Sequence, residues 1–161
     1  MEIERKFIAD REFVEAYVKA FNIVGDKIEQ YYVRVGEVEE RFRHRNGVFY
    51  HTIKTGSGLT RTEHEEKISK FEFNRNLKNR IGNVIEKTRY VLPYEQYNIE
   101  VDIYGGELDG LSICEIEFEN EQQAAAFVPT NLCIKEVTND ERFKNQNLAI
   151  DGLPDELEKI S

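Results

Sequence analysis

The sequence predicts an α+β fold in which an eight-stranded antiparallel β-barrel carries a few peripheral helices. Three observations predict it. Apolar and charged residues alternate with period two over many short segments, turn residues separate these segments, and only a few segments have helical spacing. Many antiparallel strands with few helices are typical of a closed barrel. The 161 residues contain no repeat or linker, so we expect a single domain over residues 1–161.

The first half of the chain is read mainly as strands. Asp10 can cap a helix, because Phe13, Val14, Tyr17 and Val18 then recur at helical spacing. Asn46-Gly47 is a strong hairpin signal between two alternating runs. The strands expected in this half cover about 2–8, 29–35, 38–45, 48–55 and 60–68.

The second half mixes strands with short helices. Asn120 and Gln123 resemble a capping box for a helix that runs through Phe127. Pro154 suits the first turn of a final helix. Strands are expected at about 84–92, 96–104 and 112–118, and helices at 71–79 and 139–145.

Charge and cysteine usage bound the function classes. The formal net charge is -9, from 31 acidic against 22 basic residues, which argues against a nucleic-acid or membrane-surface binder. No apolar run approaches the length of a membrane span. The start Met1-Glu2-Ile3-Glu4 lacks the features of a signal peptide, and Cys114 and Cys133 are expected to be reduced thiols. We therefore expect a cytoplasmic protein.

Charged residues recur at every second position in most of the expected strands, which places them on one face of each strand. Several of these sets contain neighbours of like charge. The sets are Glu2, Glu4 and Lys6; Glu39, Arg41 and Arg43; Thr52 and Lys54; Arg61, Glu63 and Glu65; Lys87 and Arg89; Glu100 and Asp102; and Glu115 and Glu117.

For any single strand, an ordinary solvated face is the simpler interpretation. Neighbouring like charges repel, however, so a sequence that repeats them indicates a ligand that relieves the repulsion. Pairs of acidic residues favour a hard divalent cation, and pairs of basic residues favour phosphate or carboxylate oxygens. Together they predict a metal-chelated polyphosphate enclosed by a barrel with an inward charged face.

The opening run Glu2-Ile3-Glu4-Arg5-Lys6-Phe7 resembles the ExExK signature of the CYTH superfamily, the triphosphate tunnel metalloenzymes. The later charged sets resemble the successive tunnel strands of this family in order. The tail, with Glu136-Val137-Thr138, Asp140, Arg142, Lys144 and Asn145, is similar to the end of small bacterial inorganic triphosphatases. The resemblance covers about residues 1–150 and implies an eight-stranded antiparallel tunnel that holds a triphosphate and a divalent metal.

The resemblance, together with the charge pattern, assigns a hypothetical role to each set. All candidate metal ligands are oxygen donors, which favours Mg²⁺ or Mn²⁺. The expected metal ligands are Glu2, Glu4, Asp102, Glu115 and Glu117. The expected substrate-binding residues are Lys6, Arg41, Arg43, Lys54, Arg61, Lys87 and Arg89. Supporting acidic residues are Glu39, Glu63, Glu65 and Glu100. The family's Lys–Tyr pair maps onto Lys6 and Tyr32 as catalytic residues, whereas Tyr31 faces the other way.

The preferred interpretation is a metal-dependent triphosphatase that cleaves inorganic tripolyphosphate to pyrophosphate and phosphate. A class IV-type adenylate cyclase and a thiamine or nucleoside triphosphatase are alternatives, because fold does not settle reaction. A non-catalytic polyphosphate-binding module is an alternative of another class. The expected partner is a small-molecule triphosphate, with no nucleic acid and no membrane, and a homodimer is left open.

Overall fold

The computed structural model describes residues 3–56 and 61–155. Its strands are β1 (Ile3–Ala9), β2 (Asp26–Arg34), β3 (Val38–Arg45), β4 (Val48–Thr55), β5 (Thr62–Ile68), β6 (Ile81–Tyr94), β7 (Tyr97–Tyr104), β8 (Ser112–Phe118) and β9 (Cys133–Glu136). Its α-helices are α1 (Arg11–Ala20), α2 (Lys70–Asn76), α3 (Glu121–Ala126) and α4 (Asn145–Asp151). Short 3-10 turns η2 (Leu77–Asn79), η3 (Gly106–Leu108) and η4 (Glu141–Phe143) lie between them.

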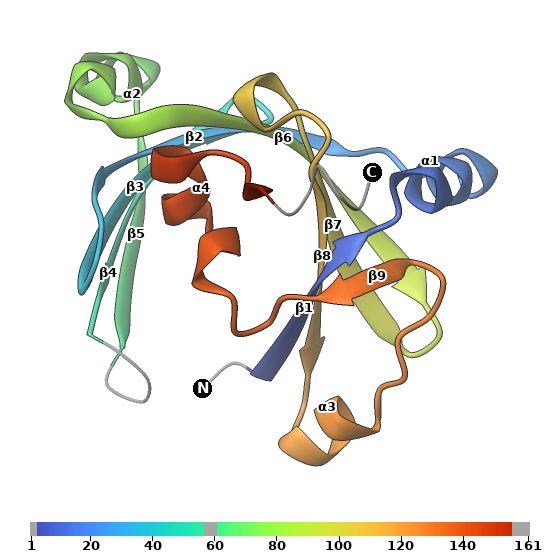
Figure 1. Ribbon diagram of the computed structural model, residues 1–161. Helices are drawn as coiled ribbons and strands as arrows, with labels where there is room; N and C mark the ends of the chain where they lie inside the picture. The colour runs from blue at the N-terminus through green and yellow to red at the C-terminus, as the bar shows by residue number, and fades with distance from the viewer. Residues whose placement is uncertain (1–2, 57–60, 156–161) are drawn as a thin grey trace.

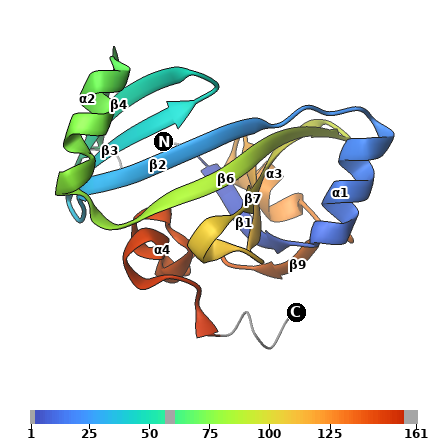
Figure 2. The same ribbon diagram turned by 90° about the horizontal axis from the view of Figure 1, so that it is seen from above.

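One antiparallel sheet contains all nine described strands, in the order β5-β4-β3-β2-β6-β7-β8-β1-β9. The sheet curves strongly, so that β3, β4 and β5 face β1 and β8 across a central space (Figure 1). Seen from above, β2 and β6 run side by side along the back of this curve (Figure 2). The antiparallel α+β architecture expected from the sequence is confirmed.

The sheet differs from the expected eight-stranded barrel in that it has nine described strands and is not closed. A ninth strand, β9, pairs with the free edge of β1, which a closed barrel would offer to β5. Beyond Glu136 the chain leaves this edge and turns into η4 and α4 on the inner side of the sheet (Figure 1). The edge strand β5 is exposed over residues 62–67, as expected of a charged strand that faces water rather than a partner. The sheet is therefore an open cup.

The outer face of the sheet is mainly apolar over β1, β7 and β8, where α1 and α3 pack on it. Asp10 caps α1 by accepting a hydrogen bond from the backbone N–H of Phe13 at 3.3 Å. Val14 of α1 is fully buried in a cluster with Phe7, Ile116 and other residues of β1, β7 and β8. Burial of these apolar side chains on the outside leaves the polar side chains of the same strands facing inward.

The inner face is apolar only at one end, where α4 lies. Leu148 and Ala149 of α4 pack in a buried cluster with Ile85 and Ile113 of the sheet. Gly82 permits this approach, because a Cβ built at its position would lie 2.3 Å from the carbonyl oxygen of Ala149. The sequence missed β9, and α4 begins only where the helix expected at 139–145 was to end. The final helix expected from Pro154 lies mostly outside the described residues.

No helix in residues 3–56 and 61–155 is long and apolar enough to cross a membrane.

Candidate active site

The strand register brings the charged sets to one concave face. Side chains at directly opposite positions of neighbouring antiparallel strands share a face. The opposite pairs are Glu65 with Thr52, Thr52 with Arg41, Arg41 with Tyr32, Arg89 with Asp102, Glu100 with Glu115, Glu115 with Lys6, and Glu117 with Glu4. Every predicted site residue in the described part of the chain, except Arg61 just before β5, lies on this face through these pairs or at a period-two position from them. Glu2 lies outside the described residues.

Carboxylates gather on β7, β8 and β1. Glu4 lies opposite Glu117, and Glu115 lies opposite Glu100 on its other side. The carboxylates therefore give this side of the site a high local density of negative charge. Like charges at opposite positions of an antiparallel pair are unfavourable. Lys6 lies opposite Glu115 and places a positive charge among these carboxylates. We call Glu4, Glu100, Glu115 and Glu117 the acidic wall.

Basic side chains gather on β3, β4 and β6, across the curve from the acidic wall. Arg41 and Lys87 are buried and Arg43 and Lys54 are partly buried, although water would favour all four charges. The Nε atom of Arg41 is buried and has no hydrogen-bond partner in the described part of the chain. Guanidinium groups held in this way provide ready donors for phosphate oxygens. We call these four residues, with Arg61 and Arg89, the basic wall.

Asp102 lies at the junction of the two walls and is held by two cations, Arg89 and Lys87. Its Oδ1 and Oδ2 accept from Nε and Nη2 of Arg89 at 2.8 and 2.9 Å, and Oδ2 is 2.9 Å from Nζ of Lys87. Burial acts to raise the pKa of Asp102, but Lys87 and Arg89 hold it well below its usual range. These contacts use three of the roughly four acceptor positions of the carboxylate, so metal binding by Asp102 is compatible with them and stays a prediction.

Lys87 is the most deeply placed cation of the basic wall. Its side chain is 0% exposed, and burial lowers its pKa to about 8 despite the neighbouring Asp102. Tyr104 places its ring 5.5 Å from Nζ. Asn145, at the start of α4, accepts from the Tyr104 hydroxyl at 2.7 Å and from Lys87 Nζ at 3.4 Å. Lys87 is therefore held between the sheet and α4.

Tyr32 occupies the inner face as predicted, and its hydroxyl is part of a buried chain. Gln30 Nε2 donates to the Tyr32 hydroxyl at 2.9 Å, and Arg43 Nε donates to Gln30 Oε1 at 2.9 Å. Burial raises the pKa of the Tyr32 phenol to about 12, so it is protonated at neutral pH. Burial also lowers the pKa of Arg43 to about 10. Tyr31 faces outward, stacks on Phe42 and donates to the carbonyl of Phe73.

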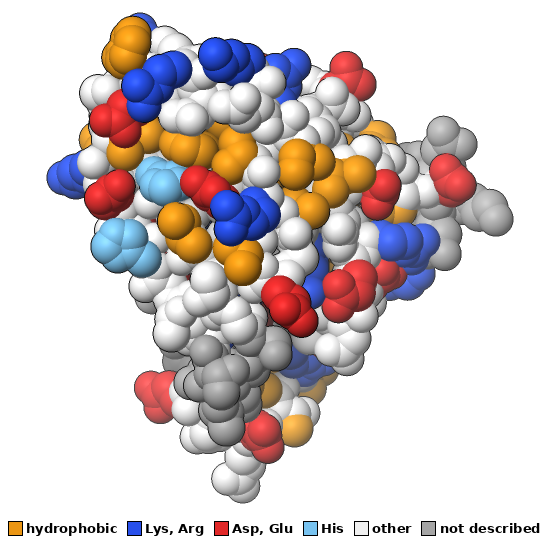
Figure 3. Space-filling view, turned by 90° about the vertical axis from the view of Figure 1, so that its left-hand side faces the viewer, with side chains coloured by type: hydrophobic (Ala, Val, Ile, Leu, Met, Phe, Trp, Pro, Cys, Tyr) orange, Lys and Arg blue, Asp and Glu red, His pale blue; other side chains and the backbone are white. Residues whose placement is uncertain are grey.

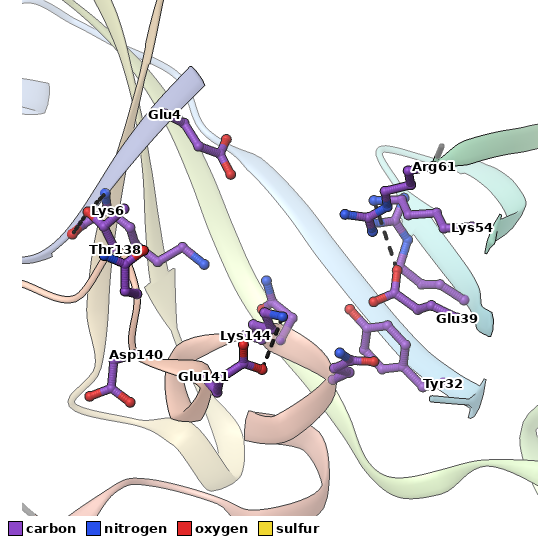
Figure 4. A pocket seen from close by; sticks show the side chains of 14 residues that line it. Glu4, Lys6, Tyr32, Glu39, Lys54, Arg61, Thr138, Asp140, Glu141 and Lys144 are labelled. Atoms are coloured by element: carbon purple, nitrogen blue, oxygen red, sulfur yellow. Dashed lines mark hydrogen bonds and ion pairs between the residues drawn. The ribbon is translucent and has the colours of Figure 1, made fainter. Parts of the chain in front are cut away.

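Between the walls lies a cavity of about 560 Å³, large enough for a triphosphate. Glu4 and Lys6 reach into it from one side, and Tyr32, Glu39 and Lys54 from the other (Figure 4). No hydrogen bond joins the Lys6 ammonium to the Tyr32 hydroxyl in the described structure. The predicted Lys–Tyr pair thus consists of two groups on opposite walls, with room for a ligand between them.

The remaining supporting acids hold cations of the basic wall. Glu65 lies 3.7 Å from Arg41 and accepts from the Thr52 hydroxyl at 2.8 Å. Glu39 lies 3.9 Å from Lys54, and Glu63 lies opposite Lys54 in the register. Glu100 of the acidic wall lies 3.8 Å from Arg89. These weak and partly exposed ion pairs can give way to a more highly charged ligand.

The segment after β9 adds a wall that has no strand pattern. The Thr138 hydroxyl accepts from the backbone N–H of Lys6 at 3.0 Å and donates to Glu136 at 2.6 Å. Lys144 lines the cavity and pairs with Glu141 at 3.1 Å. The sequence assigned Thr138 no role because nothing local marks a contact that spans 132 positions. Gln30 and Tyr104 were also missed.

Within residues 3–56 and 61–155, no three His, Cys, Asp or Glu side chains are grouped closely enough to hold a metal ion. The donor chemistry of the acidic wall nevertheless fits a hard divalent cation. Glu4, Glu115 and Glu117 provide only carboxylate oxygens, on adjacent strands of one face. A bound cation would also relieve the repulsion between opposite carboxylates. These residues therefore suit Mg²⁺ or Mn²⁺ by ligand type and charge.

The histidines lie on the outer face. His51 Nε2 is 2.6 Å from Glu40 and its ring stacks on Phe42, while His44 stacks on Phe49. This face, over β3, β4 and β5, shows histidine among apolar and charged side chains (Figure 3).

Fold and site together define a triphosphate tunnel protein of the CYTH superfamily. A putative adenylate cyclase from Bacillus halodurans has the same fold, with a TM-score of 0.57 at 17% identity over 99% of this chain and 96% of that chain. The crystal structure of an inorganic triphosphatase matches with a TM-score of 0.72 at 30% identity, over 96% of this chain and 97% of that one. No family model matches the sequence.

Two curated relatives show to which family of this superfamily the chain belongs. The inorganic triphosphatase of Nitrosomonas europaea is 35% identical over 153 residues, which cover 92% of this chain and 97% of the relative. The inorganic triphosphatase of Acetivibrio thermocellus is 36% identical over 151 residues, with 92% of each chain covered. The chain belongs to the inorganic triphosphatase family within the CYTH superfamily.

Proposed function

We propose that this protein hydrolyses inorganic tripolyphosphate to pyrophosphate and phosphate in the cavity between the acidic and basic walls. The observation that carries the proposal is one cavity that Arg41, Lys54 and Arg61 line on one side and Glu4 lines on the other. A triphosphate chelated to a divalent metal has the complementary pattern, with an anionic chain on one side and a cation on the other. Both curated relatives are named inorganic triphosphatase, which supports tripolyphosphate as the substrate.

The basic wall would bind and orient the phosphate chain. Arg41 contributes an unpartnered buried Nε, and Lys54 and Arg61 line the cavity beside it. Arg43, Lys87 and Arg89 lie deeper, where low exposure strengthens their interaction with phosphate oxygens. Phosphoanhydride cleavage depends on such positioning and charge neutralisation more than on covalent help from the protein.

The acidic wall would hold the metal, with Glu4, Glu115 and Glu117 as its first ligands and Glu2 beside them in sequence. A bound Mg²⁺ or Mn²⁺ supplies charge neutralisation and a lowered pKa for a coordinated water. Asp102 would keep Lys87 and Arg89 in place, and its remaining acceptor position would be available to the metal. Glu100 takes part by holding Arg89 at 3.8 Å.

Lys6 and Tyr32 would act at the reacting phosphoryl group from opposite sides. Tyr32 is protonated and can donate a hydrogen bond to a phosphoryl oxygen. As an ammonium Lys6 would neutralise charge, and only as a neutral amine would it accept the proton of the attacking water. Lys6→Arg separates these roles, because arginine keeps the charge but does not accept a proton. Loss of kcat as complete as in Lys6→Met, with KM retained, would assign proton transfer to Lys6, whereas retained kcat would assign it charge alone.

A substrate panel tests the function directly. Tripolyphosphate, ATP, thiamine triphosphate and pyrophosphate are each incubated with the protein and Mg²⁺ or Mn²⁺, and phosphate and cyclic AMP are measured. We expect the highest kcat/KM for tripolyphosphate and no activity in EDTA. Cyclic AMP from ATP would replace the proposal with a cyclase. Tight tripolyphosphate binding without turnover under either metal would replace it with a binding module.

The same function suits a single domain and a cytoplasmic location. Residues 1–161 would act as one tunnel domain, because β1 and the segment after β9 both contribute to a single cavity. Cys114 and Cys133, whose sulfur atoms are 4.0 Å apart and unbonded, suit the reducing cytoplasm.

A further inference from the structure

Gln30 is the fully buried amide on the inner face of β2, and it touches two residues of the candidate active site. It accepts from Arg43 Nε at 2.9 Å and donates to the Tyr32 hydroxyl at 2.9 Å. The side chain is 0% exposed, so water does not satisfy it. Its only polar partners in the described structure are therefore one substrate-binding candidate and one catalytic candidate.

The direction of both hydrogen bonds follows from chemistry. An arginine Nε–H can only donate, so the amide oxygen of Gln30 must face Arg43. The amide NH₂ must then face Tyr32, and the phenol oxygen must accept. With one lone pair occupied by this bond, the hydroxyl proton of Tyr32 is directed elsewhere. In Figure 4 the Tyr32 hydroxyl points into the cavity, toward the wall that carries Lys6.

We propose that Gln30 is a positioning residue that fixes the Tyr32 hydroxyl as a hydrogen-bond donor to the bound triphosphate and ties its orientation to Arg43. This inference rests on the proposed function for the identity of the ligand. Through the same amide, Nε of Arg43 is already engaged, so its Nη groups are the donors left for the phosphate chain. Tyr32 and Arg43 would therefore reach the ligand as one preorganised unit.

Gln30→Glu is the sharpest variant, because it nearly preserves size and reverses one bond. A carboxylate still accepts from Arg43, but it also accepts from the Tyr32 hydroxyl and so draws the proton away from the cavity. Gln30→Met is the matched apolar variant, which removes both bonds at similar volume. Tyr32→Phe removes the hydroxyl itself.

Binding of tripolyphosphate is measured by calorimetry in EDTA, and kcat and KM are measured with Mg²⁺. We expect Gln30→Glu to lose about tenfold to a hundredfold in affinity or kcat, matching Tyr32→Phe, as for one hydrogen bond to a charged group. In the Tyr32→Phe background, Gln30→Glu should cost less than about threefold more, because the two changes remove the same interaction.

Independent losses that multiply in the double variant would overturn the proposal, because Gln30 would then act through packing or Arg43 alone. Wild-type behaviour of both Gln30 variants would also overturn it. Thermal unfolding of each variant identifies any that fail to fold, and Gln30→Met then provides the comparison in place of Gln30→Glu. A wild-type protein that binds tripolyphosphate without hydrolysing it would refute the proposed function, while the EDTA binding cycle would still decide the role of Gln30.

Discussion

Replacing Asp102 with asparagine should destabilise the ligand-free protein far more than removing any carboxylate of the acidic wall. Asp102 receives two hydrogen bonds from Arg89 and one close contact from Lys87, at 2.8, 2.9 and 2.9 Å. The side chains of Lys87, Arg89 and Asp102 are only 0%, 12% and 10% exposed. Asparagine keeps one acceptor but loses the charge, so Lys87 loses its buried counter-charge and Arg89 keeps only the partly exposed Glu100 at 3.8 Å.

Removing one partner of a buried ion pair costs about 3–5 kcal/mol. Because asparagine can still accept from Arg89, we expect the lower end, about 3 kcal/mol. For a chain of 161 residues, that corresponds to a melting temperature lower by about 6–12 °C. Urea unfolding followed by far-UV circular dichroism, in EDTA and without phosphate, measures the change in unfolding free energy.

The pH dependence of this difference has a definite sign. The pKa of Asp102 is depressed in the folded protein, so its contribution to stability is present above the unfolded pKa, near 4, and is lost as the pH falls toward the folded pKa. Wild type and Asp102→Asn should therefore converge in acid. Added tripolyphosphate should also stabilise the variant strongly, since the anion replaces the missing charge.

Glu117→Gln is the control. Glu117 is exposed and lies opposite Glu4, so loss of its charge should change stability by no more than about 0.5 kcal/mol, in the stabilising direction. If Asp102→Asn unfolds within about 0.5 kcal/mol of wild type, the network of Asp102, Lys87 and Arg89 does not organise the basic wall, and the reasoning fails.

Three further predictions concern the acidic wall, Lys87 and the support of α4. Glu4→Gln should abolish metal-dependent turnover while slightly stabilising the empty protein. The control Glu66→Gln, on the outer face, should leave kcat unchanged. Normal turnover by Glu4→Gln would show that Glu4 is not a metal ligand. Tripolyphosphate binding in EDTA should weaken as the pH rises through about 8, where Lys87 loses its proton, and this step should be missing in Lys87→Met. Gly82→Ala should lower the unfolding free energy by roughly 1–3 kcal/mol, because the new methyl meets the Ala149 carbonyl at a positive φ; an unchanged urea midpoint would show that α4 accommodates it.

The sequence was most informative where function and strand geometry share a period of two. The alternation in Glu39-x-Arg41-x-Arg43 fixes which side chains share a face, and the register of β2, β3 and β4 agrees with it. The same rule separated Tyr32 from Tyr31, which the structure places on opposite faces. Faces were predictable because they depend only on neighbouring residues.

Closure and cross-chain contacts were not predictable in the same way. Whether β5 or β9 takes the free edge of β1 depends on a four-residue strand with too few positions to show a pattern. Asn145 meets Lys87 across 58 positions, through the packing of α4 on the sheet. Gln30 looks like an ordinary polar residue at the start of a strand until its two partners are known. Its signal was an amide at a period-two position from Tyr32 on the same strand.

The open edge has a mechanical consequence. Because β5 and β9 do not pair in the described structure, no backbone hydrogen bond directly joins the two edges of the cup. The distance between the two walls therefore depends on the bend of the sheet through β2 and β6, which can change without breaking a hydrogen bond between the edges. A polyanion held by cations on one wall and by a metal on the other would bridge the two walls. The bound substrate would then fix the distance that no strand pairing fixes.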